Sequence, residues 1–501
     1  MILDPGKVSL DQLRDLWRGE AARLSDDARA AIADSHAVVS RIVAGGETVY
    51  GVNTGFGLLA SEKIPQARLA ELQRNLILSH SCGLGAPLPR HVTRLMMLLK
   101  LVGLGRGASG VRVELVEALQ ALVDADAIPE VPSQGSVGAS GDLAPLAHMT
   151  AAMLGEGWID LGGERLPARE ALARIGMEPV TLGPKEGLAM INGTQASTAI
   201  ALDALFKAER VFDAAIAAGA LSVDALKGSV KPFDARISEL RGHASQVEVA
   251  RRLRDWLAGS EIVDSHHRCG KVQDPYSFRC QPQVMGASLD LIGKVAAMLE
   301  IEANAVTDNP VLFGAEDEEA DEAISGGNFH AQPVAFAADM LAMALCEVGS
   351  LSERRTSVLV DPKMSGLPAF LIDDGGVNSG LMIPQVTAAA LVSENKALAH
   401  PASVDSIPTS AGQEDHVSMA PIAARKAGQI ADNVAGVVAV ELIAGAQGVD
   451  YHAPLRTSPR LQALHAKVRE HSAYLESDRY WADEMAALQA AVLAGALFEG
   501  G

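Results

Sequence analysis

The chain has 501 residues, which suits two to four domains or one large core with a smaller attachment. Hydrophobic residues make up 48% and charged residues 21%, so a disordered chain is excluded and an ordinary globular protein is indicated. The formal net charge is -20 and the acidic residues are spread along the chain, which argues against nucleic acid or an anionic membrane as a partner.

The cysteines and the N-terminal residues predict a cytoplasmic protein. The four cysteines form no C-x-x-C pair and are too few for a disulfide framework, so a reducing compartment is expected. The N-terminus lacks a basic stretch followed by an apolar core, and no apolar run reaches about 18 residues. We therefore expect neither a signal peptide nor a membrane-spanning helix. The roles of Cys82 and Cys269 stay open.

The first hundred residues predict helices separated by glycine-rich loops. Residues 9–45 have apolar positions at helical spacing, with Ser9 and Asp11 as candidate caps. The stretch Tyr50-Gly-Val-Asn-Thr-Gly-Phe-Gly57 has too many glycines for a helix and is predicted to be a loop. Residues 66–102 read as helical, with a break at residues 82–89.

A glycine-rich stretch follows at Gly135-Ser-Val-Gly-Ala-Ser-Gly-Asp-Leu-Ala-Pro-Leu-Ala-His148. A turn that feeds a helix and binds an anion is one interpretation. However, no lysine follows the glycines as in a P-loop, and neither G-x-G-x-x-G nor G-x-S-x-G fits the spacing. A second Ala-Ser-Gly tripeptide at residues 108–110 lacks the following Asp-Leu-Ala-Pro, so the tripeptide by itself is a weak signal.

The order of residues at Ala139-Ser140-Gly141 suits an internal cyclisation. A tight turn that brings the Gly141 nitrogen onto the Ala139 carbonyl carbon lets a five-membered ring close. Loss of water then gives an imidazolone, and loss of the Ser140 hydroxyl leaves an exocyclic methylidene. Gly141 permits the approach because it has no Cβ. The product is an electrophile made from the chain itself, which takes the place of a cofactor.

This stretch resembles the signature of the aromatic amino acid ammonia-lyases, specifically their histidine branch. Four further blocks match this family, and the resemblance runs from about residue 45 to about residue 450. The blocks are Tyr50–Gly57, Asn192-Gly-Thr-Gln-Ala196, Gln273-Asp-Pro-Tyr-Ser-Phe-Arg279 and Gln413-Glu-Asp-His416. The resemblance implies a methylidene-imidazolone formed from Ala139, Ser140 and Gly141, and no external cofactor.

The resemblance also implies roles for residues of the first half of the chain. Tyr50 corresponds to the base that removes the substrate β-proton, although a free tyrosine titrates near 10 and needs nearby positive charge or preorganisation. His80 corresponds to the position that reads the substrate ring, and Ser79-His80 resembles the histidine branch, where other branches carry Phe-Leu or His-Leu. Asn192 corresponds to a residue that hydrogen-bonds the electrophile or the substrate carboxylate region.

The second half of the chain predicts a mainly α protein. A short hairpin is expected at residues 158–166, turning at Gly162-Gly163. Beyond it, long segments have apolar residues at i, i+3 and i+4, with too few β-rich segments for a large sheet. These segments are 196–220, 283–305, 331–353, 384–400 and 421–446. We expect an elongated bundle of long helices at 197–501 and a smaller, loop-rich, mostly helical N-terminal domain at 1–196 that carries the active-site loops.

Loops between these helices carry further candidates. His266-His-Arg-Cys269 has ligand residue types, but no second cluster completes a tetrahedral site, so no metal is expected. By the resemblance, Arg279 binds the substrate carboxylate through its bidentate fork, and Tyr276 and Gln273 position electrophile and substrate. Phe329 is implied near the ring. Glu414 is implied as the acid that faces the substrate imidazole, which the phenylalanine branch lacks.

Together the motifs predict non-oxidative elimination of ammonia from L-histidine, giving trans-urocanate. Either the substrate amine or its imidazole ring attacks the electrophile, and the sequence does not choose between them. Many predicted helices are apolar on more than one face, which fits the homotetramer that the resemblance implies, with active sites assembled from several chains. The only partner expected besides other subunits is the small-molecule substrate.

Three alternatives remain at this point. The nearest is a tyrosine or phenylalanine ammonia-lyase or aminomutase on the same scaffold, which Ser79-His80 and Glu414 argue against. Another is a helical scaffold in which the ring never forms. A serine hydrolase built on Ser140 and His148 is the third, and it lacks an oriented partner acid.

Overall fold

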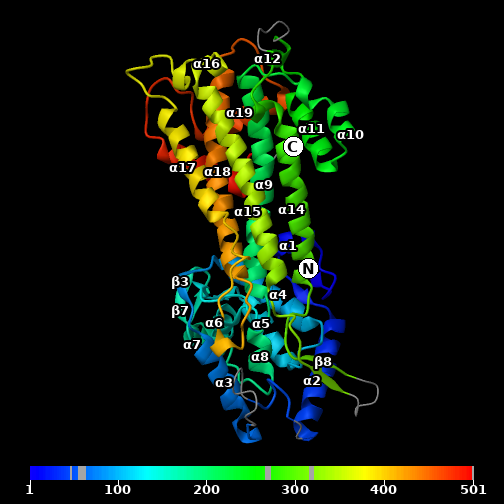
Figure 1. Cartoon of the computed structure of the whole chain (residues 1–501). Coiled ribbons are helices and arrows are strands. Elements are labelled where there is room, and N and C mark those ends of the chain that lie inside the picture. The colour runs from blue at the N-terminus through cyan, green and yellow to red at the C-terminus, as the bar shows by residue number, and fades with distance from the viewer. Residues whose placement is uncertain (46–47, 55–63, 266–271, 315–320, 499–501) are drawn as a thin grey trace. The chain divides into compact units, whose positions relative to one another are not determined.

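A computed structural model describes residues 1–45, 48–54, 64–265, 272–314 and 321–498 (Figure 1). The chain forms two compact units of three segments each. Unit 1 comprises Met1–Asp203, Ala296–Ala338 and Pro401–Arg425, and unit 2 comprises Ala204–Val295, Asp339–His400 and Lys426–Gly501. The division into domains at 1–196 and 197–501 stays a prediction. The compact units differ from it in kind, because each unit combines segments that are distant in sequence.

Helices dominate the described chain, so the prediction of a mainly α fold is confirmed. Those wholly in unit 1 are α1 (Leu10–Trp17), α2 (Asp26–Gly45), α3 (Leu69–His80), α4 (Arg90–Gly105), α5 (Val113–Asp124), α6 (Leu143–Met153), α7 (Ala168–Arg174) and α8 (Glu186–Ile191). Those wholly in unit 2 are α10 (Ala235–Arg241), α11 (Ala244–Leu257), α12 (Glu261–Asp264), α13 (Tyr276–Arg279), α16 (Pro362–Ser365), α17 (Met382–Leu398), α19 (Pro459–His471) and α20 (Ala482–Ala494).

Four of the five points at which the chain passes between the units lie within long helices, and the fifth lies between His400 and Pro401, after α17. These four helices are α9 (Gln195–Ala225), α14 (Gln281–Ala303), α15 (Gln332–Val360) and α18 (Ala420–Asp450). Together with α17 they confirm the five long helices predicted from apolar spacing. Short 3-10 turns are η2 (Gln66–Arg68), η3 (Lys231–Phe233), η5 (Ala369–Leu371) and η6 (Ser410–Gly412).

The strands are short and form small sheets. Pairs are β1 (Ile2–Leu3) with β2 (Arg23–Leu24), parallel, β3 (Leu84–Pro87) with β5 (Pro132–Gln134), antiparallel, and β8 (Val311–Phe313) with β9 (Glu322–Ile324), antiparallel. A three-stranded sheet has the order β4 (Ala127–Pro129), β6 (Trp158–Leu161), β7 (Glu164–Pro167). The predicted hairpin is confirmed, because β6 and β7 are antiparallel with Ile159 opposite Leu166.

Local signals explain where the N-terminal helices begin and end. Ser9 caps α1 in a capping box with Gln12, as its position before the apolar pattern predicts. The segment 9–45 forms two helices, α1 and α2. Gly19, at φ +106°, follows the end of α1, and β2 then pairs with β1 before α2 begins. The predicted break at 82–89 is confirmed, and β3 lies within it.

A buried polar cluster ties three helices within unit 2. The Arg355 guanidinium on α15 donates to both carboxylate oxygens of Glu441 on α18, at 2.5 and 2.8 Å, and both side chains are fully buried. Ser222 on α9 and Ser352 on α15 donate to the same carboxylate, at 2.7 and 2.6 Å. Since a buried ion is stable only when its partners are present, this cluster fixes the register of α9, α15 and α18.

Two helices, α15 and α18, are long and apolar enough to cross a membrane by length and composition, contrary to the expectation that none would be. The apolar window of α15 is 61% buried and that of α18 is 78% buried. A buried helix in the core of a water-soluble protein passes the same test, so these two helices are weak grounds for a membrane span.

Candidate active site

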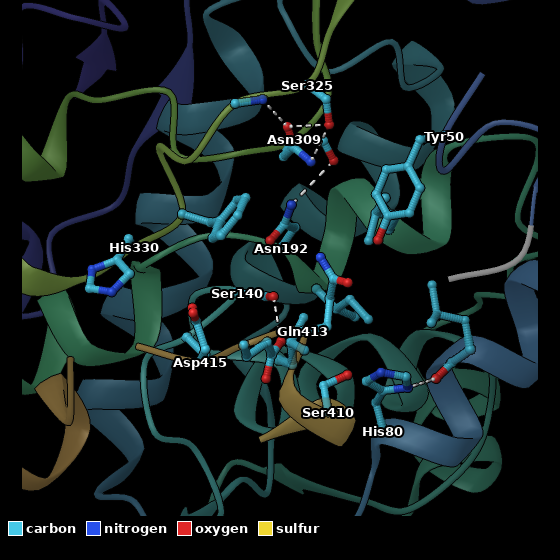
Figure 2. A pocket seen from close by; sticks show the side chains of 18 of the residues that line it. Tyr50, His80, Ser140, Asn192, Asn309, Ser325, His330, Ser410, Gln413 and Asp415 are labelled. Carbon is cyan, nitrogen blue, oxygen red and sulfur yellow. Dashed lines mark hydrogen bonds between the residues drawn. The ribbon is translucent and has the colours of Figure 1, made fainter. Parts of the chain in front are cut away.

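A cavity of about 1060 Å³ in unit 1 brings together many of the residues singled out in the sequence (Figure 2). Tyr50, His80, Ala139, Ser140, Asn192, Phe329 and Glu414 all line it. They come from six separate parts of the chain, so only the fold assembles them. Gln413, Asp415 and His416, which belong to a matching block but were given no role, also line it, as do residues that the sequence did not single out, among them Asn309, Ser325 and Ser410.

The loop before α6 holds Ser140 in a tight turn at the cavity wall. Gly141 has φ +70° and packs against Gly193: a Cβ placed on Gly141 would lie 2.1 Å from the Gly193 carbonyl oxygen. The Asp142 amide donates to that same oxygen at 2.7 Å. Gly138, at φ +65°, packs on Ser418 in the same way. These positions need glycine, because any side chain would meet backbone or a buried hydroxyl.

The Ser140 hydroxyl donates to Oε1 of Glu414 at 2.7 Å. Thr409 donates to the other carboxylate oxygen at 2.6 Å, which orients the Glu414 side chain. Between these two residues the backbone of Ser410 and Ala411 has φ of +50° and +55°, a left-handed conformation that is costly for residues with a Cβ. The strained turn therefore presents Glu414 to Ser140.

His80 ends α3 and its ring has a defined hydrogen-bonding pattern. Nδ1 lies 2.8 Å from the Leu76 carbonyl oxygen and 3.0 Å from the Ser79 hydroxyl. A carbonyl oxygen only accepts, so Nδ1 carries the proton and Nε2 of the neutral ring is left as an acceptor. Because His80 lines the cavity, that acceptor is available to a donor on a bound ring.

Asn192 follows α8 and is 3% exposed. Its Nδ2 donates to the Asn309 carbonyl at 3.2 Å, while its Oδ1 is buried with no hydrogen-bond partner among the described residues. The Asn309 side chain is itself fixed, accepting from the Gly326 amide at 2.7 Å and donating to Ser325 at 3.1 Å. An orphaned amide oxygen at a cavity wall suits a ligand donor.

Tyr50 lies in a turn, as predicted, and is partly buried. The turn is closed by the Val49 amide, which donates to the Asn53 side chain at 2.9 Å. Gly51, at φ +75°, packs so closely on Leu188 that a Cβ would lie 2.3 Å from it. Gly55, Phe56 and Gly57 lie outside the described residues.

Buried charges lie behind the Ser140 loop. Asp142 is fully buried and accepts from the Ser197 amide and hydroxyl, at 2.7 and 2.8 Å, and burial raises its pKa to about 6. Lys100 is 2% exposed and donates to the Asn192 carbonyl at 2.7 Å, and burial lowers its pKa to about 7. Lys185 and Asp308 form a buried ion pair at 2.6 Å. The sequence did not single out Lys100, because one lysine within an apolar helical pattern is usually a solvated residue.

The geometry argues against a serine hydrolase. Nε2 of His148 accepts a hydrogen bond from the Gly83 amide at 3.0 Å, and burial lowers the pKa of this histidine. The Ser140 hydroxyl donates to Glu414 instead. His148 therefore has its lone pair occupied and is not placed to activate Ser140.

Three predicted site residues, the catalytic Tyr276 and the substrate-binding Gln273 and Arg279, belong to unit 2. Gln273 precedes α13, and Tyr276 and Arg279 lie on it. Tyr276 is 70% exposed, and the Arg279 guanidinium carbon lies 4.5 Å from its ring centroid. Arg279 Nε is buried and has no hydrogen-bond partner among the described residues. None of the three lines the cavity of unit 1.

The other predicted features lie away from the cavity or outside the described residues. His266 and Cys269 fall outside them, and Cys82 is an exposed free thiol. Within the described ranges there is no group of three residues that could ligate a metal ion.

Comparison with known proteins identifies the class. The sequence matches the family described as aromatic amino acid lyase over residues 8–470. The chain belongs to this family, as its motifs predict, and it therefore belongs to a family of lyases with a mainly α fold.

Within the family, the matches favour one branch. The chain is 57% identical over 487 residues to a histidine ammonia-lyase of Burkholderia ambifaria, covering 97% of this chain and 95% of that protein. The crystal structure of histidine ammonia-lyase from Trypanosoma cruzi has 41% identity and a TM-score of 0.91, covering 99% of this chain and 94% of that one. Tyrosine aminomutase from Streptomyces globisporus has a TM-score of 0.93 at 32% identity, covering 98% and 97%. The backbone is thus shared across branches, and sequence separates them.

Proposed function

We propose that this protein is an ammonia-lyase that eliminates ammonia from L-histidine to give trans-urocanate, the first step of histidine degradation. The observation that carries the proposal is the cavity of unit 1, which is lined by Ser140, Glu414, Tyr50 and His80 together. The relatives named as histidine ammonia-lyases support the choice of substrate.

Ala139, Ser140 and Gly141 fit the methylidene-imidazolone that the family uses. Gly141 has a positive φ, and a Cβ there would fill the space taken by Gly193. When formed, this group supplies an electrophile that no ordinary side chain provides. Glu414 is placed to orient the Ser140 hydroxyl before it leaves as water.

The imidazole side chain of the substrate would be read by His80 and Glu414. Nε2 of His80 accepts from a ring N–H, because Leu76 keeps the proton on Nδ1. The Glu414 carboxylate accepts from the second ring N–H, so these two acceptors suit the protonated imidazolium, in which both ring nitrogens are donors. A phenyl ring offers neither donor and would leave both acceptors buried without partners, which disfavours phenylalanine strongly.

Tyr50 would act as the base that removes the β-proton. Its turn is fixed by Asn53 and by the packing of Gly51 on Leu188, so its position relative to the Ser140 loop is preorganised. Because the base and the leaving group are held in place, the reaction does not need to bring them together, and the elimination proceeds as an effectively unimolecular step. Asn192, with its orphaned Oδ1, would accept from the substrate amine or a neighbouring donor, and Phe329 would pack on the ring.

A homotetramer would complete the site. Arg279 of unit 2, stacked on Tyr276, offers a bidentate fork for the substrate carboxylate, and Gln273 lies on the same segment. We propose that these three residues serve the cavity of another subunit, in a cytoplasmic enzyme that needs no external cofactor, metal, nucleic acid or membrane.

The test is a substrate panel. Purified protein is offered L-histidine, L-tyrosine and L-phenylalanine in turn, and the absorbance of the unsaturated acid product is followed, with Ser140→Ala in parallel. We expect a product from L-histidine alone and none from Ser140→Ala. A product from tyrosine or phenylalanine in place of histidine would show that His80 and Glu414 were misassigned, and silence with all three would favour an inactive scaffold.

A further inference from the structure

A buried lysine that the proposed mechanism does not use lies directly behind the Ser140 loop. Lys100, on α4, is 2% exposed, and its ammonium donates to the carbonyl of Asn192 at 2.7 Å and lies 3.4 Å from Oε1 of Gln195. Both are neutral acceptors. A lysine is rarely fully buried unless paired, because removing its charge from water is costly. Its placement against a backbone carbonyl therefore calls for an explanation.

That carbonyl belongs to the turn that clamps the Ser140 loop. Gly193, the next residue, accepts the Asp142 amide at 2.7 Å and is bridged to Gly141. Gly193 has φ +127°, and a Cβ on it would lie 2.5 Å from Gln195 Oε1 and 2.8 Å from Thr307 Oγ1. Lys100 thus bonds the turn at Asn192, and the Ser140 loop contacts it at Gly193.

Further bonds join the turn to residues outside the Ser140 loop. The Thr194 amide donates to Thr307 Oγ1 at 3.2 Å, and the Asn192 side chain donates to the Asn309 carbonyl at 3.2 Å. Among the bonds of this turn, the one from Lys100, at 2.7 Å, and the one from the Thr194 hydroxyl to Glu302, at 2.6 Å, involve ionisable side chains and are charge-assisted when those side chains are ionised. Such bonds are about twice as strong as neutral ones.

We propose that Lys100 is a positioning residue for the internal cyclisation of Ala139, Ser140 and Gly141: by bonding the Asn192 carbonyl, it fixes the Asn192–Thr194 turn that contacts Gly141 and so holds the conformation from which the ring closes. This proposal rests on the proposed function, because it presumes that the ring forms. Lys100 does not touch the reacting atoms.

The cyclisation balances without an added reagent. The Gly141 nitrogen bonds to the Ala139 carbonyl carbon, and the carbonyl oxygen leaves as water with the protons of the Gly141 and Ser140 nitrogens, leaving a carbon–nitrogen double bond. The Ser140 hydroxyl then leaves as a second water with the proton of its own Cα. Nothing is oxidised, and the peptide becomes lighter by two water molecules.

The surrounding charges suit a positioning role. Burial lowers the pKa of Lys100 to about 7, while the carboxylates of Asp308 and Asp142 raise it and the ammonium of Lys185 lowers it. In either protonation state the side-chain nitrogen carries hydrogens and donates to the Asn192 carbonyl. Replacing it by an apolar side chain of similar length leaves that buried carbonyl without this partner.

The experiment measures ring formation directly and separately from turnover. The full chain is synthesised in a cell-free system, samples are taken over time, and the mass of the proteolytic peptide that carries residues 139–141 gives the cyclised fraction. Lys100→Met removes the donor, and Lys100→Gln keeps a shorter, neutral one. Gln120→Leu is the matched control, because Gln120 is a buried polar residue of the same unit that bonds Ala22 and Asp124 instead of the turn.

We expect Lys100→Met to cyclise at least about tenfold more slowly than wild type, Lys100→Gln to be intermediate, and Gln120→Leu to cyclise at the wild-type rate. Thermal unfolding, followed by circular dichroism, shows whether each variant is folded and how stable it is, so that cyclisation rates are compared only between folded variants. Cyclisation of folded Lys100→Met at the wild-type rate would overturn the proposal. If Lys100→Met does not fold, the rate of Lys100→Gln decides: slower than Gln120→Leu supports the proposal, and equal to it overturns it. A wild-type peptide of full mass would instead refute the proposed function.

Discussion

At the scale of single residues, the site depends on a backbone that only glycine allows. Gly141 is in the left-handed region and touches Gly193, so its hydrogen occupies a place where a methyl group cannot fit. Ser140 supplies a hydroxyl to Glu414 from the same turn. The conformation, the contact and the leaving group therefore depend on three consecutive residues.

Gly141→Ala tests this dependence. The added Cβ would lie 2.1 Å from the Gly193 oxygen, so the turn must open and the peptide of residues 139–141 should keep its full mass. The matched control is Gly162→Ala, since Gly162 also has a positive φ, +61°, but nothing lies within 4 Å of its Cβ position. The control should lose about 1 kcal/mol of stability and cyclise normally. Normal cyclisation in Gly141→Ala would refute the assigned role of the turn.

Several site residues could be predicted because they belong to short sequence motifs that match the family. The structure places Tyr50, His80, Asn192 and Glu414 around one cavity, as the motifs imply. Asn309 and Lys100 could not be found this way. Asn309 acts through its position beside Asn192, and Lys100 occupies an apolar helical pattern in which a single lysine reads as a solvated residue.

At the scale of elements, long helices follow from apolar spacing, whereas short strands do not. The apolar spacing marked α9, α14, α15, α17 and α18 to within a few residues at most ends. The two-residue strands β1 and β2 escaped notice, because pairing between Ile2 and Arg23 is a long-range contact with no local signature. The same holds for β3, which pairs with a strand more than forty residues away.

The buried cluster of α9, α15 and α18 gives a prediction about stability. Glu441→Leu should lower the free energy of unfolding by about 3–5 kcal/mol, because it leaves the Arg355 charge buried without a partner. The double variant Arg355→Met, Glu441→Leu should recover most of that loss. Urea unfolding of the single and double variants measures the coupling. Additive losses would show that the two side chains do not depend on each other.

Asp224, at the end of α9, predicts a dependence on pH. It accepts hydrogen bonds from Ser260, at 2.7 Å, and from Thr457, and burial raises its pKa to about 6. Between about pH 4 and pH 6 the folded chain therefore holds a proton that the unfolded chain has released. The contribution of Asp224 to the free energy of unfolding must fall as pH rises through this window, by up to about 3 kcal/mol.

Asp224→Asn should remove this contribution. Urea unfolding of wild type and variant at about pH 4 and pH 7 gives the comparison, with the wild type losing its relative advantage at the higher pH. Because Asp142 also has a raised pKa, only the difference between the two proteins is informative. A difference that stays constant across this range would mean that Asp224 titrates normally.

At the scale of the whole molecule, the residues of the proposed site are divided between the two units. Tyr50, His80 and Glu414 belong to unit 1, and Gln273, Tyr276 and Arg279 belong to unit 2. The resemblance of the sequence to the family assigned all of these residues to one active site. It could not say which chain of an assembly supplies each, because composition and spacing carry no information about subunit pairing.

Mixing variants tests the proposed sharing of sites between subunits. Tyr50→Phe and Arg279→Ala should each be nearly inactive alone, whereas co-expression should restore roughly a quarter of the sites if the two residues come from different chains. Tyr50→Phe co-expressed with Ser140→Ala is the control and should restore nothing, since both residues line one cavity. Absence of restoration in the first mixture would mean that one chain supplies both Tyr50 and Arg279.

The most direct test of the whole account is the mass of the proteolytic peptide carrying residues 139–141, taken from protein whose turnover of L-histidine has just been recorded. We predict that this peptide is lighter by two water molecules than its sequence requires, and that Ser140→Ala yields a peptide without this loss and no turnover. A peptide of full mass from protein that releases ammonia from L-histidine would contradict the account, because the elimination would then proceed without the electrophile.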